Sequence, residues 1–311
     1  MKNRRKFLQE AATLTMGAMG FSKLGWTEPF TMHKPLPATG LQLFTLLMNM
    51  DNDPMGTLQK VANAGYKNIE SAFSKLPGFY GKKPKEFKTL IHDLGMEWKS
   101  HHVTGTPLKM PPNFIIPKGP DGQPLSFPVM KNLRDNGQEM IDLVAEAGIP
   151  YIVCSSIDIE SGDGIKKSAE ILNRTGELAK KAGLKFAYHN HATEFDVTDG
   201  VVSYDYFTSQ ISSDILKLEI DLGWVFKAGR NPVEIFKKNK GRIPLLHVKD
   251  MTKEGAIVPF GEGSYNFIEA FNNIDIAGVE YFFLEQDFPL KPLEHIVTSF
   301  QNFEKFRKAI S

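Results

Sequence analysis

Residues 181–195 read "KAGLKFAYHNHATEF" and combine a structural pattern with a chemical one. The structural part is Gly183, which fits the left-handed position that ends a helix, followed by an apolar run typical of a buried strand. The chemical part comes directly after it, because two histidines, one amide and one carboxylate lie between His189 and Glu194. This stretch therefore predicts a strand that opens into a polar edge with several metal-ligating groups.

The same glycine phrase recurs along the chain, in "NAGYKNIE" at 63–70, "DLGMEWKS" at 93–100, "EAGIPYIV" at 146–153 and "IAGVEYFF" at 276–283. Stretches with apolar residues three and four positions apart precede several of these glycines, which is the pattern of amphipathic helices. Together with three further apolar runs, the phrases predict eight strands, at about 41–47, 67–73, 97–103, 151–157, 184–190, 216–221, 244–249 and 281–286.

The alternation of strands and helices predicts a parallel sheet of the α/β class. Eight such units predict a (β/α)8 barrel, the TIM barrel, over residues 38–311. A doubly wound sheet is the alternative architecture. That architecture usually carries a glycine-rich phosphate loop after the first strand, whereas residues 48–56 read "MNMDNDPMG".

The composition excludes some classes of function. The 311 residues are 41% hydrophobic and 23% charged, which is ordinary for a globular protein. A net charge of +1 provides no basic field, so we expect no nucleic-acid partner. Cys154 is the only cysteine, which excludes a disulfide within the chain and a thiolate metal cage. A homo-oligomer is compatible with the sequence, which does not set the number of subunits.

The N-terminal segment has the features of an export signal. Arg4-Arg5-Lys6-Phe7-Leu8 resembles the twin-arginine signal, and a mildly apolar run at 11–21 follows it. Because that run is short and glycine-rich, we expect no membrane association beyond a signal or a retained N-terminal anchor. Residues 1–30 are therefore predicted to be a twin-arginine-type signal segment of a periplasmic or otherwise exported protein, with a basic tail as the plainer alternative.

An insertion at residues 104–129 follows the third predicted strand and is rich in proline and glycine. A loop at this position would lie over the face on which barrel enzymes bind their substrates. A lid that contacts substrate and a plain surface loop are both open interpretations.

Polar residues gather at the predicted carboxyl ends of the strands and not at their amino ends. In a barrel the last inward-facing residues line the catalytic mouth, so these side chains would meet. Carboxylates and imidazoles without cysteine suit one divalent ion, with Mn²⁺ the best match and Mg²⁺, Co²⁺ or Zn²⁺ as alternatives. The strand-end residues are Glu70, His101, His102, His189, Asn190, His191, Glu194, Glu219, Asp221, His247, Lys249, Asp250, Glu285, Gln286 and Asp287.

Five motifs carry a resemblance to a known family, namely "AYHNHATEF" at 187–195, "LEIDLGWVFKAGRNP" at 218–232, "GRIPLLHVKDM" at 241–251, "VPFGEGSYNF" at 258–267 and "YFFLEQD" at 281–287. In this order they resemble the sugar phosphate isomerase/epimerase group of the xylose-isomerase-like barrels, over residues from about 40 to 309. The resemblance is specific for the fold and less so for the substrate, because that superfamily includes isomerases, epimerases, dehydratases, lyases and endonucleases.

The resemblance implies one metal ion held by Glu, Asp, His and Glu at the ends of strands five to eight. Asp221, His247 and Glu285 match the last three of these positions. At the first position relatives often read Glu-Asn-His, whereas this chain reads "HNH" at 189–191.

Two residues compete for the strand-five position. Either His189 replaces the usual glutamate, or Glu194 reaches the ion from the following loop. We favour Glu194, because a carboxylate keeps the usual ligand charge, and His189 then becomes a candidate base. With a histidine at position 189, the chain departs from the two-glutamate proton shuttle of the family. This departure strengthens a lyase or dehydratase interpretation.

The remaining candidates complete the predicted site. The catalytic candidates are His189, Glu285 and Lys249. The substrate-binding candidates are Glu70, His102, His191 and Trp224, whose ring could stack on a sugar face. For each residue taken alone, a structural hydrogen-bonded role is the alternative.

The site predicts a metal-dependent isomerase or epimerase that acts on a small-molecule sugar by removing a proton next to a carbonyl. A lyase or dehydratase acting on a 3-keto-glycoside at the same site is the first alternative. A phosphodiesterase of the endonuclease branch and a non-catalytic sugar-binding barrel are the other two.

Overall fold

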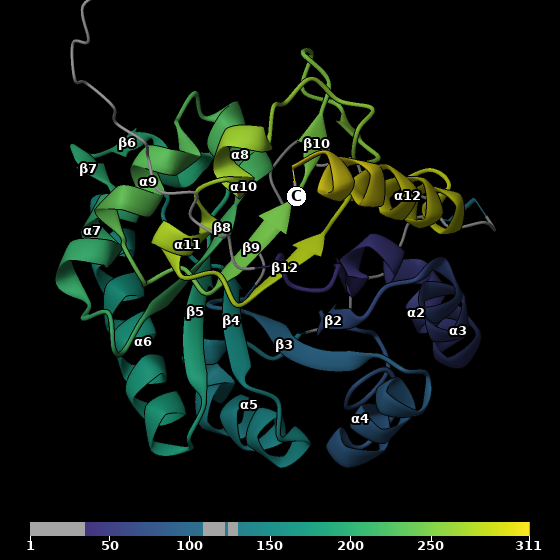
Figure 1. Ribbon diagram of the computed structural model, residues 1–311. Helices are drawn as coiled ribbons and strands as arrows, with labels where there is room; N and C mark the ends of the chain where they lie inside the picture. Colours follow the sequence, from purple (N-terminus) through teal and green to yellow (C-terminus); the bar gives the residue numbers. More distant parts are fainter. Residues whose placement is uncertain (1–34, 108–121, 124–129, 311) are drawn as a thin grey trace, which may run out of the picture. The chain divides into compact units, whose positions relative to one another are not determined.

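Eight parallel strands close into a barrel in the computed structural model, with the strands of the barrel neighbouring one another in chain order (Figure 1). The barrel architecture predicted from the sequence is therefore confirmed. The barrel strands are β1 (Gly40–Gln42), β2 (Asn68–Ser71), β3 (Glu97–Thr104), β4 (Tyr151–Ser156), β5 (Lys185–His189), β8 (Lys217–Asp221), β9 (Leu245–Val248) and β12 (Tyr281–Leu284).

Helices surround these strands and alternate with them along the chain (Figure 1). They are α2 (Leu47–Asn52), α3 (Pro54–Ala64), α4 (Pro84–Asp93), α5 (Leu133–Ala147), α6 (Gly162–Lys181), α7 (Ser203–Gln210), α8 (Leu222–Lys227), α9 (Pro232–Lys238), α10 (Ile268–Phe271), α11 (Ile274–Ala277) and α12 (Pro292–Ile310). Two short antiparallel pairs lie outside the barrel, β6 (Val197–Thr198) with β7 (Val201–Val202) and β10 (Asp250–Met251) with β11 (Ile257–Val258).

The structure describes residues 35–107, 122–123 and 130–310. The predicted signal segment at 1–30 and most of the predicted lid at 104–129 lie outside the described residues, so both stay predictions. Within the described ranges, no helix has both the length and the apolarity needed to cross a bilayer.

The first strand is much shorter than the predicted 41–47. After Gln42 the chain turns into the 3-10 helix η1 (Leu43–Leu46), and α2 follows it. Leu43, Leu46 and Met50 are all fully buried, and their spacing of three and four residues is that of a helix rather than a strand. The Gln42 side chain ends the strand, because its oxygen accepts a hydrogen bond from the Phe44 backbone N–H at 3.1 Å.

The predicted helix-ending glycines are confirmed in all five phrases, since each has a positive φ, between 63° and 112°. The alternation of side chains along each strand then sets what fills the barrel. An apolar interior cluster consists of Tyr151, Val153, Ala187, Leu245 and Phe283. Two residues further along β5, β9 and β12 the same inward-facing positions become polar, so the barrel interior changes from apolar to ionisable towards the carboxyl ends of the strands.

Gly223 determines how closely α8 approaches β9. A Cβ built on Gly223 would lie 2.3 Å from the backbone oxygen of Lys249, which cannot move without displacing the strand end. We therefore expect Gly223→Ala to lower the free energy of unfolding by about 1–3 kcal/mol, the usual cost of overpacking. Chemical denaturation measures this change.

Gly137→Ala is the matched control in α5, because the nearest atom to its new Cβ lies 4.0 Å away. There alanine should raise stability by up to about 1 kcal/mol through helix propensity alone. Equal effects of the two substitutions would contradict a tight contact between α8 and β9.

Candidate metal centre

Four side chains from neighbouring strand ends converge on one small region of the barrel mouth. They are His189 of β5, Asp221 of β8, His247 of β9 and Glu285, which directly follows β12. One donor atom from each lies within 4.8 Å of the others. All four side chains are buried, the Glu285 side chain being only 6% exposed. We call these four residues the mouth group.

Asp221 is oriented by the helix that follows it. Its Oδ1 accepts a hydrogen bond from the Trp224 backbone N–H at 3.0 Å and so caps the N-terminus of α8. Its Oδ2 has no hydrogen-bond partner among the described residues, and the Lys249 Nζ lies 3.4 Å from it. Burial raises the pKa of Asp221. A buried carboxylate oxygen without a hydrogen bond is costly unless a cation compensates it.

His189 uses its two ring nitrogens in different directions. Its Nε2 lies 4.0 Å from Asp221 Oδ2 in the mouth group, and its Nδ1 lies 3.1 Å from Glu219 Oε2 deeper in the barrel. Burial and the His247 imidazole lower the pKa of His189 well below its usual value, so the ring is neutral. A neutral imidazole with one nitrogen hydrogen-bonded to a carboxylate is the usual state of a metal-ligating histidine.

His247 has the same two-sided arrangement. Its Nδ1 lies 2.8 Å from Glu285 Oε2 in the mouth group, and its Nε2 lies 2.5 Å from Glu70 Oε2. Burial acts to lower the pKa of His247, but the carboxylates of Glu219 and Glu285 outweigh it and raise this pKa well above its usual value. A cation bound by the mouth group would take the place of the proton on Nδ1.

Beneath the mouth group, His102 bridges two fully buried carboxylates. Its Nε2 lies 2.6 Å from Glu219 and 3.1 Å from Glu70. Burial acts to lower the pKa of His102, but these two carboxylates raise it to about 9. Gln42 and Ser100 also donate hydrogen bonds to Glu70, at 2.7 and 2.5 Å. We call Glu70, His102 and Glu219 the inner layer. Their charges and hydrogen bonds hold this layer rigidly.

Glu219 is the residue of the inner layer whose role the sequence did not reveal. Burial and the neighbouring Glu70 raise its pKa to about 7. His102, His189, Glu219 and His247 form a second group of potential ligands, but its members are buried, and its imidazoles and Glu219 Oε2 already contact one another. The signal for Glu219 was its position two residues before Asp221, which places both side chains on the inward face of β8.

Lys249 is a buried ammonium, 1% exposed, at the edge of the mouth group. Its Nζ lies 2.9 Å from Asp287, 3.0 Å from Glu285 and 3.4 Å from Asp221. Burial acts to lower the pKa of Lys249, but these carboxylates raise it above its usual value, so the charge is permanent. The Trp224 ring centre lies 4.8 Å from the same Nζ.

Glu194 lies outside both ligand groups. Residues 193–195 form the 3-10 helix η2 (Thr193–Phe195), which directs this carboxylate towards Tyr188, whose hydroxyl donates to Oε1 at 2.9 Å. Strand alternation places Tyr188 on the opposite face of β5 from His189. Glu194 therefore lies away from the mouth group, in which His189 stands, and the ligand role of either residue stays a prediction.

Glu194 instead supports His191. Its Oε2 accepts the His191 backbone N–H at 2.9 Å, and its Oε1 lies 3.6 Å from His191 Nδ1. Although burial acts to lower the pKa of His191, the contact with Glu194 raises it. The His191 side chain is 39% exposed, whereas the mouth-group side chains are buried.

The other predicted substrate-binding residues differ in their access. Glu70 is fully buried and bonded to protein groups, so the structure places it behind the mouth group. His102 is 8% exposed in its side chain and borders a cavity. Trp224 lies at the mouth, its ring centre 5.7 Å from that of His191.

The donor set fits a divalent cation. When ionised, Asp221, Glu285 and Asp287 carry three negative charges, and Lys249 supplies one positive charge. A divalent ion would neutralise the remaining two charges, with His189 and His247 as neutral ligands. Mixed oxygen and imidazole ligands are compatible with several first-row metals.

Comparison with known proteins places this site in a family. A family model described as xylose isomerase-like TIM barrel matches residues 58–297. The chain belongs to this family. Solved structures agree with the xylose isomerase-like fold. A sugar phosphate isomerase/epimerase from Parabacteroides distasonis has a TM-score of 0.70 at 22% identity, covering 86% of this chain and 98% of that one. The IOLI protein with a bound zinc atom has a TM-score of 0.63 at 15% identity, covering 88% and 99%.

Curated relatives of this xylose isomerase-like barrel include inosose dehydratases. That of Clostridium perfringens is 29% identical over 155 residues, which cover 42% of this chain and 51% of the relative. The match thus spans about half the length of that relative. That of Lacticaseibacillus casei is 25% identical over 251 residues, covering 76% of this chain and 72% of the relative.

Glu219, the buried carboxylate beside His189, should increase the affinity of the mouth group for a metal ion. We expect Glu219→Gln to weaken Mn²⁺ binding about 10- to 100-fold, because the amide no longer holds the His189 ring by a charged hydrogen bond. Electron paramagnetic resonance of free Mn²⁺ during titration measures the affinity. Glu269→Gln, on the exposed side of α10, is the control and should bind as the unaltered chain does. Unchanged affinity in Glu219→Gln would refute this supporting role.

Proposed function

We propose that this protein is a divalent-metal enzyme that removes a proton from the carbon next to a carbonyl of a sugar or keto-sugar and returns it, as an isomerase or epimerase does. The convergence of His189, Asp221, His247 and Glu285 on one region, with the Lys249 ammonium beside them, is the observation that carries the proposal. The family supports a sugar-type substrate, since its relatives carry names of sugar-processing enzymes.

The mouth group would hold the ion, and we propose Mn²⁺ because two carboxylates and two imidazoles match its preference for oxygen and nitrogen donors. The bound ion would supply Lewis acidity to neighbouring substrate oxygens. Asp221 would offer Oδ2, which α8 leaves free by taking Oδ1 as its cap. Glu219 and Glu70 would hold the two imidazole rings in the ligating orientation.

His191 is the best-placed group to accept the substrate proton. Both ring nitrogens of His189, the base candidate from the sequence, already face carboxylates. His191 instead has an accessible side chain at the mouth, and Glu194 beneath it stabilises the imidazolium that forms when the proton arrives. Lys249 would face the negative charge that develops on the substrate oxygen as the proton leaves.

A dehydratase or lyase is the second candidate, and the curated inosose dehydratase relatives favour it. The first step would be the same transfer of a carbon-bound proton to His191. The outcome would differ afterwards, because a group on the next carbon would leave with its bonding electrons instead of the proton returning. Product analysis separates the two candidates.

Exchange of carbon-bound hydrogen into D₂O tests the proposed function. With Mn²⁺-loaded protein and a panel of aldoses, ketoses and 3-keto-glycosides, we expect exchange with at least one substrate class. Glu285→Gln should reduce the rate by at least about 100-fold, because it removes a ligand charge and a contact of Lys249. Glu294→Gln, exposed on α12, is the control. Undiminished exchange in Glu285→Gln would exclude this site, and no exchange with any substrate would indicate a sugar-binding barrel.

The role of His191 has its own test. His191→Ala should lower the exchange rate about 10²- to 10⁴-fold, the range expected for loss of a general base, while Mn²⁺ affinity stays the same. His92→Ala on α4, where the side chain is 74% exposed, should change neither quantity. If His191→Ala keeps full activity, another group accepts the proton.

A further inference from the structure

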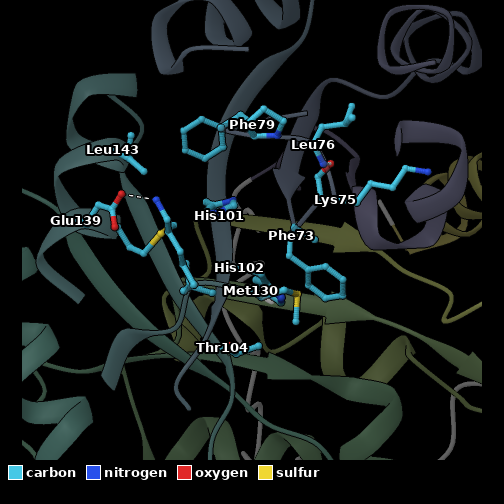
Figure 2. Close-up of a pocket in the computed structure, with 17 residues that line it drawn as sticks. Phe73, Lys75, Leu76, Phe79, His101, His102, Thr104, Met130, Glu139 and Leu143 are labelled. Atoms are coloured by element: carbon cyan, nitrogen blue, oxygen red, sulfur yellow. Dashed lines mark hydrogen bonds and ion pairs between the residues drawn. The ribbon is translucent and has the colours of Figure 1, made fainter. Parts of the chain in front are cut away.

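A cavity of about 460 Å³ lies between the loop after β2, the end of β3 and the middle of α5 (Figure 2). Its size is within the usual range for small-molecule sites. Six of the larger lining side chains are hydrocarbon or thioether, and the charged side chains of Lys75, Lys131 and Glu139 line the cavity as well. Phe73, Leu76 and Phe79 come from the loop side, and Met130, Met140 and Leu143 come from the α5 side.

The cavity adjoins the inner layer of the metal centre through His102. The His102 ring borders the cavity, while its Nε2 lies 2.6 Å from Glu219. The ring centres of His189 and His247 each lie 5.1 Å from that of His102. One imidazole therefore separates the cavity from two mouth-group residues.

Aromatic side chains also extend from the cavity rim to the segment that follows β12. The ring centre of Phe73 lies 5.6 Å from that of Phe44, which follows β1, and Phe44 lies 5.1 Å from Phe288. Phe288 directly follows Asp287, the ion-pair partner of Lys249. Three phenylalanines thus form an apolar row from the cavity to the residue after Asp287.

Two polar groups in the cavity lining can recognise a ligand. Thr104 is 4% exposed, and its Oγ1 has no hydrogen-bond partner in the described part of the chain. His101 is held from one side, because its Nδ1 lies 2.8 Å from Ser71 Oγ, which accepts a hydrogen bond from Trp98 at 2.8 Å. When the Ser71 hydroxyl donates to Nδ1, the ring hydrogen of His101 is on Nε2, where it can donate to a ligand.

We propose that this cavity binds the aglycone of a glycoside, an aromatic group with a hydrogen-bond-accepting oxygen, whose sugar ring lies at the metal centre. This inference rests on the proposed function, which it deepens by naming the substrate class. A second sugar ring fits the cavity less well, because the hydroxyls that face the six apolar side chains would lose hydrogen bonds to water, and only part of the lining is polar. An aromatic ring fits both walls and stacks favourably on phenylalanine.

Binding of paired glucosides tests the inference without turnover. Calorimetry with the Mn²⁺-loaded full chain compares phenyl and methyl glucosides, each as both anomers. We expect one phenyl anomer to bind at least about tenfold more tightly than its methyl counterpart, because the ring leaves water for an apolar pocket. Phe73→Ala should reduce this preference at least about fivefold and leave the methyl glucoside unchanged.

A second variant changes the α5 wall of the cavity. Its effect does not depend on whether Phe73→Ala rearranges the loop after β2. Leu143→Trp should fill the cavity and weaken phenyl glucoside binding, again without effect on the methyl glucoside. Leu290→Ala, 97% exposed in the loop after β12, is the control and should preserve the preference. Absence of the phenyl preference, its survival in both cavity variants, or no detectable phenyl glucoside binding would each overturn the inference.

The two proposals fail in different ways. A phenyl preference that depends on Phe73, found in a protein that exchanges no carbon-bound hydrogen, would refute the proposed function and keep the cavity as an aglycone site. Exchange with no aromatic preference would keep the function and refute the aglycone site.

Discussion

Mutual charge compensation among buried groups is the constraint on which the rest of the barrel mouth depends. Charged groups removed from water must be paired or must bind a metal ion. In this protein the buried carboxylates come from several strands, so no single strand can neutralise them. The imidazoles and the lysine ammonium that pair with these carboxylates come from other strands. The site therefore exists only when the barrel is closed. The groups concerned are Glu70, Glu219, Asp221, Glu285, His102, His189, His247 and Lys249.

The strand period of two arranges these groups in layers. On β8, Glu219 belongs to the inner layer and Asp221 to the mouth group. The imidazole of His189 connects the layers, since one ring nitrogen faces each of them, and His247 does the same from β9. The inner carboxylates therefore determine which nitrogen of each ring is available at the mouth, which is how distant groups control a metal centre.

Most of the fold could be predicted from the sequence, because helix-ending glycines and apolar runs are local signals. The first strand was predicted too long, because Leu43 and Leu46 are apolar in either geometry and only packing decides between them. The convergence of Asp221, His247 and Glu285 was also within reach, since strand parity fixes where they point, while their role as ligands stays a prediction. The position of Glu194 away from these residues was not within reach, because it depends on a 3-10 turn that no local pattern encodes.

The most direct test of this account is a crystal structure with Mn²⁺, analysed by anomalous diffraction at the manganese edge. We expect one anomalous peak at the barrel mouth, in contact with His189, Asp221, His247 and Glu285, with Glu194 still bonded to Tyr188 and His191. A peak ligated by Glu194, or one that leaves Asp221, His247 and Glu285 out of reach of the same ion, would contradict it.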